Sequence, residues 1–119
     1  MITKHGADVA GSNSIYNGYD GILYCINNGA NIVSVSWGGG GASQYYQDVI
    51  RYALKKNVIV VAAAGNGGAD NEITPHYPSS YRGVLAVGAS DSQDKKAGFS
   101  NYGKPEFVKV FAPGVDILT

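Results

Sequence analysis

The chain has 119 residues, which is enough for one small domain and too few for two. Hydrophobic residues make up 45% and charged residues 15%, a composition typical of a globular protein and not of a disordered one. The 9 basic and 9 acidic residues cancel, so there is no excess of Lys and Arg to neutralise nucleic-acid phosphates. The single cysteine excludes an internal disulfide, and no apolar segment has the length of a membrane span or the character of a signal peptide.

The first periodic segment predicts a helix over residues 13–27. Its apolar residues recur at helical spacing and include Ile15, Tyr19, Ile22 and Ile26. Asn13 or Ser14 can cap its start, and Gly29 is a typical helix stop. The β-branched run at residues 32–36 then predicts a strand.

A glycine run at residues 38–41 leads to a second amphipathic segment, which Ser43 can cap and Asn57 can close. One face of this predicted helix carries Tyr46, Val49, Ile50, Ala53 and Leu54. The next run, residues 58–63, is apolar without alternation, which predicts a parallel strand covered on both faces.

Two further apolar runs, residues 84–87 and 108–111, come after a polar loop and predict two more strands. This order of elements predicts an α/β fold, an open parallel sheet flanked by helices. Ligands of such sheets bind outside the carboxyl ends of the strands. The expected functional positions are therefore residues 36–39 and 64–67.

Six blocks of the sequence carry recognisable patterns. They read GANIVSVSWGG at residues 29–39, VIVVAAAGN at 58–66, HYPSSY at 76–81, VLAVGAS at 84–90, FSNYG at 99–103 and FAPG at 111–114. In order and separation these blocks resemble the subtilisin-like serine proteases, the subtilase family, from about Gly11 to the last residue. The resemblance implies that residues 1–119 are the central part of a single subtilase catalytic domain, an incomplete three-layer sandwich.

Asn66 occupies the position of the family's oxyanion-hole asparagine. Amide hydrolysis passes through a tetrahedral oxyanion, and a preorganised amide donor aimed at that oxygen stabilises the transition state. The resemblance therefore implies a catalytic role for Asn66. From the residues alone, Gly65-Asn66-Gly67 also fits an ordinary turn, because asparagine tolerates positive φ.

The resemblance also implies a substrate-binding groove for a peptide or protein substrate. In the family, one strand of this groove pairs with the substrate backbone; the matching residues here are Ser36, Trp37, Gly38 and Gly39. Trp37 is expected to form one wall of a side-chain pocket. The pocket for the residue before the scissile bond is expected to be lined by Ala63, Ala64 and Gly65, and Gly11 resembles the opposite side of the groove.

The catalytic triad is expected to lie outside this chain. The family's serine belongs to a GTS motif and its aspartate to a D-S/T-G motif, and neither occurs in these 119 residues. His5 begins a block similar to the family's histidine motif, but Asp8 replaces the second histidine. Too few residues follow for the family's intervening helix and strand, so a loop histidine is the favoured interpretation of His5.

The remaining candidates favour structural interpretations. We expect His76 to be solvated in a surface loop and Cys25 to be a buried apolar residue. No metal site is expected from the spacing of Asp70, Asn71 and Glu72, although the resemblance makes calcium a possible cofactor. The resemblance alone favours a secreted or cell-envelope location, and the sequence predicts neither nucleic-acid nor membrane partners.

Two other functions stay open at this point. The glycines at residues 38–41 lie between a strand and a helix, the layout of a nucleotide-binding turn, with Asp70 as a ribose ligand. Ser43 stands where the third glycine of that motif belongs, which weakens this alternative. The other alternative is a catalytically dead relative that only binds peptides.

Overall fold

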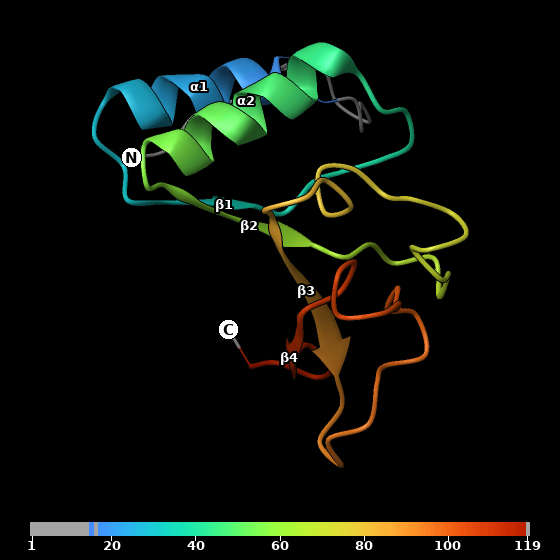
Figure 1. Ribbon diagram of the computed structural model, residues 1–119. Coiled ribbons are helices and arrows are strands. Elements are labelled where there is room, and N and C mark those ends of the chain that lie inside the picture. The colour runs from blue at the N-terminus through green and yellow to red at the C-terminus, as the bar shows by residue number, and fades with distance from the viewer. Residues whose placement is uncertain (1–14, 16, 119) are drawn as a thin grey trace.

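The computed structural model describes residue 15 and residues 17–118 (Figure 1). The elements are α1 (Gly18–Asn27), β1 (Ile32–Val35), α2 (Gln44–Lys55), β2 (Ile59–Ala63), β3 (Leu85–Ser90) and β4 (Val110–Pro113). Their order confirms the predicted α/β fold. None of the described helices has the length and apolar character needed to cross a membrane.

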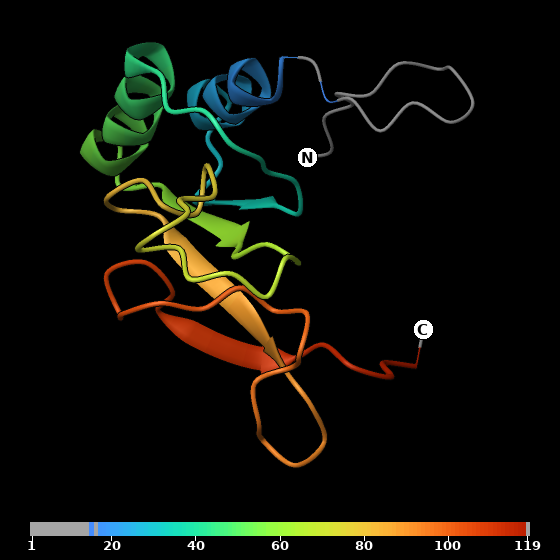
Figure 2. The same cartoon turned by 90° about the vertical axis from the view of Figure 1, so that its right-hand side faces the viewer.

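The four strands form one sheet in the order β1-β2-β3-β4, and every neighbouring pair is parallel. Val35 at the end of β1 lies opposite Ala62 near the end of β2. The sheet twists from β1, beside the helices, down to β4 at the far edge (Figure 2). The open parallel sheet is thereby confirmed.

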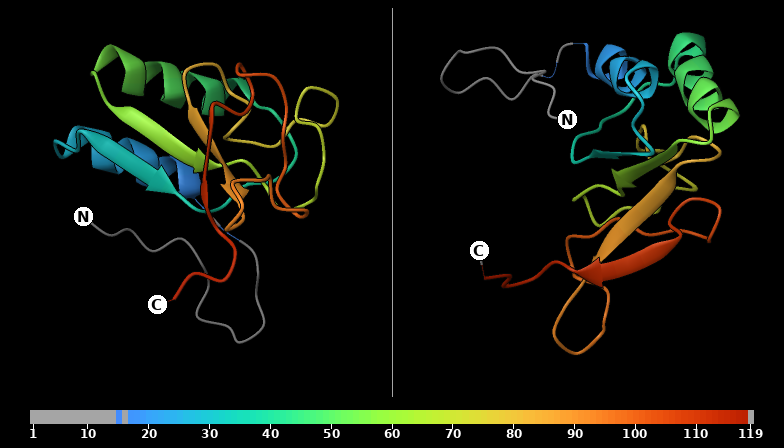
Figure 3. Two further views of the ribbon diagram at one scale, coloured as in Figure 1. Left: turned by 90° about the horizontal axis from the view of Figure 1, so that it is seen from below. Right: turned by 90° about the vertical axis from the view of Figure 1, so that its left-hand side faces the viewer.

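The two helices pack against the β1–β2 half of the sheet, on one face. Seen from below, β1 and β2 lie in front of both helices (Figure 3, left). Alternate strand residues point toward the helices and are buried, as are the apolar residues on the facing sides of the helices. This core contains Ile22, Cys25, Ile26, Val33, Val35, Val49, Ile50, Ala53, Val60, Ala62 and Val84.

The opposite face of the sheet is not covered by the described residues. Ile59 on β2 is 50% exposed and Ile32 on β1 is 61% exposed, and both strands alternate between buried and more exposed positions. The expectation that residues 58–63 are covered on both faces is therefore wrong for the described residues. A continuous apolar run indicates that both faces of the strand are covered in the folded protein. It does not indicate which part of the protein supplies the covering elements.

The helix termini follow the expected chemistry with one exception. Ser43 caps α2, because its Oγ accepts a hydrogen bond from the Tyr46 backbone N–H at 3.2 Å. Asn57 (φ 56°) and Gly29 (φ 82°) end the two helices in left-handed conformations. The exception is the start of α1, where the N-cap is Asn17 with no side-chain cap, and the predicted caps lie outside the described residues.

Two apolar residues expected on the buried faces of the helices are partly exposed. Ile15 lies before α1 and is 45% exposed, and Leu54 in α2 is 46% exposed. The α1 expectation is wrong because the helix begins only at Gly18. Leu54 lies at the edge of the α2 stripe and packs beside Gly83, where an added Cβ would lie 2.5 Å from Leu54 Cδ1.

Candidate functional site

The two segments expected to be functional lie at the same edge of the sheet. Residues 36–39 follow β1 and residues 64–67 follow β2, and these strands are parallel neighbours. The carboxyl ends of parallel neighbours meet at one edge, which is where such folds bind ligands. The predicted placement of the two segments agrees with the structure, and their function stays a prediction.

The backbone of residues 36–39 is partly engaged by a later loop. Gly39 and Tyr77 exchange two hydrogen bonds, Gly39 N to Tyr77 O at 2.9 Å and Tyr77 N to Gly39 O at 2.7 Å. In extended chain, alternate residues direct their N–H and C=O groups to opposite sides. On this pattern, the backbone groups of Gly38 and Ser36, one and three positions before Gly39, are expected on the side away from Tyr77.

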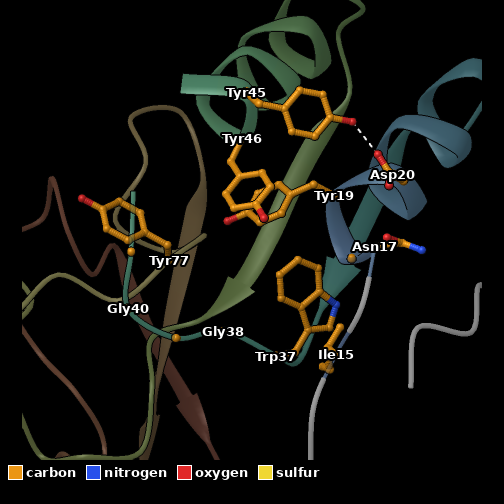
Figure 4. A pocket seen from close by; sticks show the side chains of 13 residues that line it. Ile15, Asn17, Tyr19, Asp20, Trp37, Gly38, Gly40, Tyr45, Tyr46 and Tyr77 are labelled. Atoms are coloured by element: carbon orange, nitrogen blue, oxygen red, sulfur yellow. Dashed lines mark hydrogen bonds between the residues drawn. The ribbon is translucent and has the colours of Figure 1, made fainter. Parts of the chain in front are cut away.

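Trp37 forms one wall of a cavity of about 370 Å³. The cavity lies between the start of α1, the start of α2 and the glycine run (Figure 4). Its lining is mainly aromatic and glycine and comprises Ile15, Asn17, Gly18, Tyr19, Asp20, Trp37, Gly38, Gly39, Gly40, Gly41, Tyr45, Tyr46 and Tyr77. The sequence pattern pointed to Trp37 but not to the tyrosines, which come from three separate segments.

The aromatic rings of this cavity hold one another in place. Tyr19 stacks on Tyr46 with ring centroids 3.8 Å apart and meets Trp37 edge-on at 5.3 Å. Burial raises the pKa of the Tyr19 hydroxyl, and the hydrogen bond from the Tyr45 hydroxyl to Asp20 raises the pKa of Tyr45. Both phenols are therefore neutral at ordinary pH, and Asp20 is the acidic residue at the mouth of the cavity.

Asn66 lies in an exposed bend directly after β2. The preceding residue, Gly65, has φ 112°, a backbone conformation that residues other than glycine rarely adopt. Asn66 also borders a second cavity of about 410 Å³, together with Ala63, Ala64 and Gly65. The other walls of that cavity come from β3, β4 and the segment around Ser100, and not from residues 36–39.

The bend that carries Asn66 is held by two buried asparagines. Asn101 Oδ1 accepts hydrogen bonds from the backbone N–H groups of Gly67 at 2.8 Å and Ala69 at 3.1 Å. Asn101 Nδ2 donates to Asn71 Oδ1, and Asn71 Nδ2 donates to the Ala64 carbonyl, both at 2.9 Å. No sequence pattern indicated a role for Asn101, and Asn71 was considered only as a cation ligand.

His76 is not the solvated loop residue that we expected. Its ring lies between the two functional segments, because a Cβ added at Gly38 would overlap His76 Cε1 and one added at Gly65 would lie 3.1 Å from His76 Cδ2. The Ser79 hydroxyl donates to the His76 carbonyl at 2.6 Å, so its oxygen is left to accept from His76 Nδ1 at 3.2 Å. Desolvation lowers the pKa of His76.

We predict that His76 makes the protein less stable in mild acid. Its folded-state pKa is lowered, whereas the unfolded chain takes up a proton at about pH 6.5. Unfolding therefore binds a proton as the pH falls below about 6.5, and the free energy of unfolding decreases there. Thermal unfolding between pH 8 and 5 should show a smaller loss for His76→Gln than for the wild type. His5→Gln is the matched control, and an equal loss in wild type and His76→Gln would contradict the prediction.

The loop at residues 70–72 uses its polar side chains for hydrogen bonds within the chain. Asp70 Oδ1 accepts from the Glu72 N–H, Glu72 pairs with Lys104 at 2.7 Å, and Asn71 points inward to Ala64 and Asn101. Over residues 15 and 17–118, no three His, Cys, Asp or Glu side chains gather into a metal-binding group. Gly11 and His5 lie outside the described residues, and Cys25 is buried as expected.

Fold and site together define an open parallel α/β protein in which an exposed asparagine lies just beyond β2, at the carboxyl edge of the sheet. The chain belongs to the subtilase family, whose model matches residues 2–119. It is 41% identical over 119 residues to the thermophilic serine proteinase of Bacillus sp. (strain AK1), covering 100% of this chain and 28% of that protein. Thermitase of Thermoactinomyces vulgaris is 39% identical over 95 residues, 80% of this chain and 32% of thermitase.

Solved structures give the same result. The prenylagaramide maturation protease PagA superposes with a TM-score of 0.78 at 37% identity, over 90% of this chain and 41% of that one. The chain therefore spans about a third of the length of the curated relatives named above and less than half of this structural neighbour.

Proposed function

We propose that the intact protein is a serine-type endopeptidase that hydrolyses peptide bonds through an acyl-enzyme, and that these residues supply Asn66 as the oxyanion donor. The observation that carries this proposal is the setting of Asn66. Asn66 is exposed at the carboxyl end of β2, while the backbone around it is fixed by hydrogen bonds with the side chains of Asn101 and Asn71. A donor held in this way needs no reorganisation when negative charge develops on the substrate carbonyl.

The edge formed by residues 36–39 is proposed to bind the substrate backbone. Gly39 is occupied by Tyr77, so the groups of Ser36 and Gly38 remain to pair with an extended peptide on the opposite side. The aromatic cavity beside Trp37 would then receive a side chain of that peptide, since Trp37, Gly38 and Gly39 belong both to this edge and to the cavity lining.

The nucleotide-binding alternative gains no support from the glycine run. The N-terminus of α2, where a phosphate would bind, is capped by the Ser43 side chain, and the Ser43 N–H donates to the Tyr81 hydroxyl at 2.9 Å. The remaining alternative is a relative that binds peptides but does not cleave them. It would differ from the proposed protease in lacking a working catalytic triad.

Labelling with a serine-directed phosphonate distinguishes an active serine protease from a relative that only binds peptides. The intact protein should be labelled at one serine and should cleave a peptide substrate. The 119-residue segment, which contains no GTS motif, should neither react nor turn over substrate. An intact protein that binds peptides but resists the phosphonate would overturn the protease proposal in favour of the dead relative.

A further inference from the structure

We propose that Asn101 and Asn71 are positioning residues for the oxyanion donor: they form a buried amide relay that fixes the bend carrying Asn66. This inference rests on the proposed role of Asn66. It concerns two residues that would touch neither the substrate nor the triad and would act only through the backbone of residues 64–69.

The relay joins three parts of the chain by side-chain hydrogen bonds. It starts at the Ala64 carbonyl at the end of β2, passes through the side chains of Asn71 and Asn101, and ends at the N–H groups of Gly67 and Ala69. Asn66 lies between the two anchored ends. Both flanks of the donor are therefore tied to one rigid unit.

The orientation of both amides is determined by their partners. Asn101 Oδ1 faces two N–H donors, and Asn71 Nδ2 faces a carbonyl oxygen, so flipping either amide would bring like groups together. Asn71 is 0% exposed and Asn101 is 4% exposed, so water has little access to the hydrogen bond between the two amides. A relay of this kind is rigid, because breaking one link leaves buried polar groups unpaired.

The bend needs such support because glycines surround Asn66. Gly65, Gly67 and Gly68 have no side chains of their own to pack, and Gly65 and Gly68 have positive φ values of 112° and 62°. Gly65 also allows the close approach of Asn101, since a Cβ there would lie 2.5 Å from Asn101 Nδ2. The glycines therefore admit the relay, and the relay supplies the rigidity that they lack.

The backbone of the Asn101 segment adds to this attachment. Asn101 N donates to the Gly65 carbonyl at 2.9 Å, and Gly68 N donates to the Phe99 carbonyl at 2.8 Å. These bonds keep the segment beside the bend when a side chain is changed. Removing the Asn101 amide should therefore loosen the bend without detaching it, which leaves a folded variant to measure.

The test is a double-mutant cycle in the intact protease with Asn66→Ala and Asn101→Ala. We expect Asn101→Ala to lower kcat on the order of 10-fold to 100-fold with KM changed by less than about twofold, because a displaced donor weakens only transition-state contacts. In the Asn66→Ala background, Asn101→Ala should have almost no further effect on kcat.

Two further variants keep the test decisive. Asn101→Asp retains an oxygen acceptor for the two N–H groups, but its second carboxylate oxygen faces the Asn71 Oδ1 acceptor. The Asn71 end of the relay is broken while the Gly67 and Ala69 end is kept, so the kcat of this variant should lie between those of wild type and Asn101→Ala. It replaces Asn101→Ala in the cycle if that variant fails to fold. Ser90→Ala is the matched control, because it removes another buried polar side chain, 7% exposed at the end of β3, that belongs neither to the relay nor to the lining of the cavity beside Asn66.

The outcomes separate the two proposals. Losses in kcat that multiply in the double variant would overturn the positioning role while leaving Asn66 as the donor. The positioning role is also overturned if Ser90→Ala lowers kcat as much as Asn101→Ala does. If Asn66→Ala itself leaves kcat unchanged, the proposed function fails, and the positioning role fails with it.

Discussion

Asn66→Ala in the intact protein should lower kcat on a peptide substrate by roughly 10²–10³, with KM close to its original value. This magnitude is the one known for the oxyanion-hole asparagine of subtilisin and is carried over from the family. The reason is that the Asn66 amide would meet the substrate oxygen only when it carries negative charge. Binding of the uncharged substrate would not use this donor. Steady-state kinetics with a peptide substrate measure both constants.

Two controls make the Asn66 result specific. Asn66→Asp keeps the size of the side chain and replaces the donor by an acceptor, so it should lose at least as much kcat as the alanine variant. Asn31→Ala changes an exposed asparagine at the opposite end of β1 and should leave both constants unchanged. A rise in KM that accounts for the loss in kcat/KM would assign Asn66 to substrate binding instead.

The elements of the fold were predictable because their signals are local. Periodicity located both helices, Ser43 and Gly29 marked helix termini, and the apolar runs located all four strands to within about three residues at each end. The start of α1 was not predictable. Apolar spacing continues upstream to Ile15, while the helix itself begins at Gly18 beside Trp37, a contact between segments that are distant in sequence.

The candidate site was predictable only where a residue follows a strand. Ser36 and Asn66 come directly after apolar runs, so the parallel topology brings their segments to one edge. Asn101 and His76 had no such signal. Asn101 reaches residues more than thirty positions earlier, and His76 is half-buried because two glycines in other segments leave room for its ring. Burial of a polar residue depends on tertiary packing, which residue type and spacing do not report.

The second large effect is expected in the core and not at the site. Ile50→Ala should reduce the free energy of unfolding by about 2–5 kcal/mol, because truncating a buried isoleucine removes apolar contacts and leaves a cavity. Ile50 is 1% exposed on the face of α2 that packs toward the sheet. Denaturant unfolding of the intact protease measures the change, or the rate of thermal inactivation if unfolding is irreversible.

Leu54→Ala in the same helix is the matched control. Sequence periodicity placed Leu54 and Ile50 on the same buried face, four residues apart, whereas the structure leaves Leu54 46% exposed. The control should therefore cost about 1 kcal/mol or less. Equal losses in the free energy of unfolding for Ile50→Ala and Leu54→Ala would mean that Leu54 is buried in the intact protein. The comparison thus tests whether the described packing of α2 persists in the intact protein.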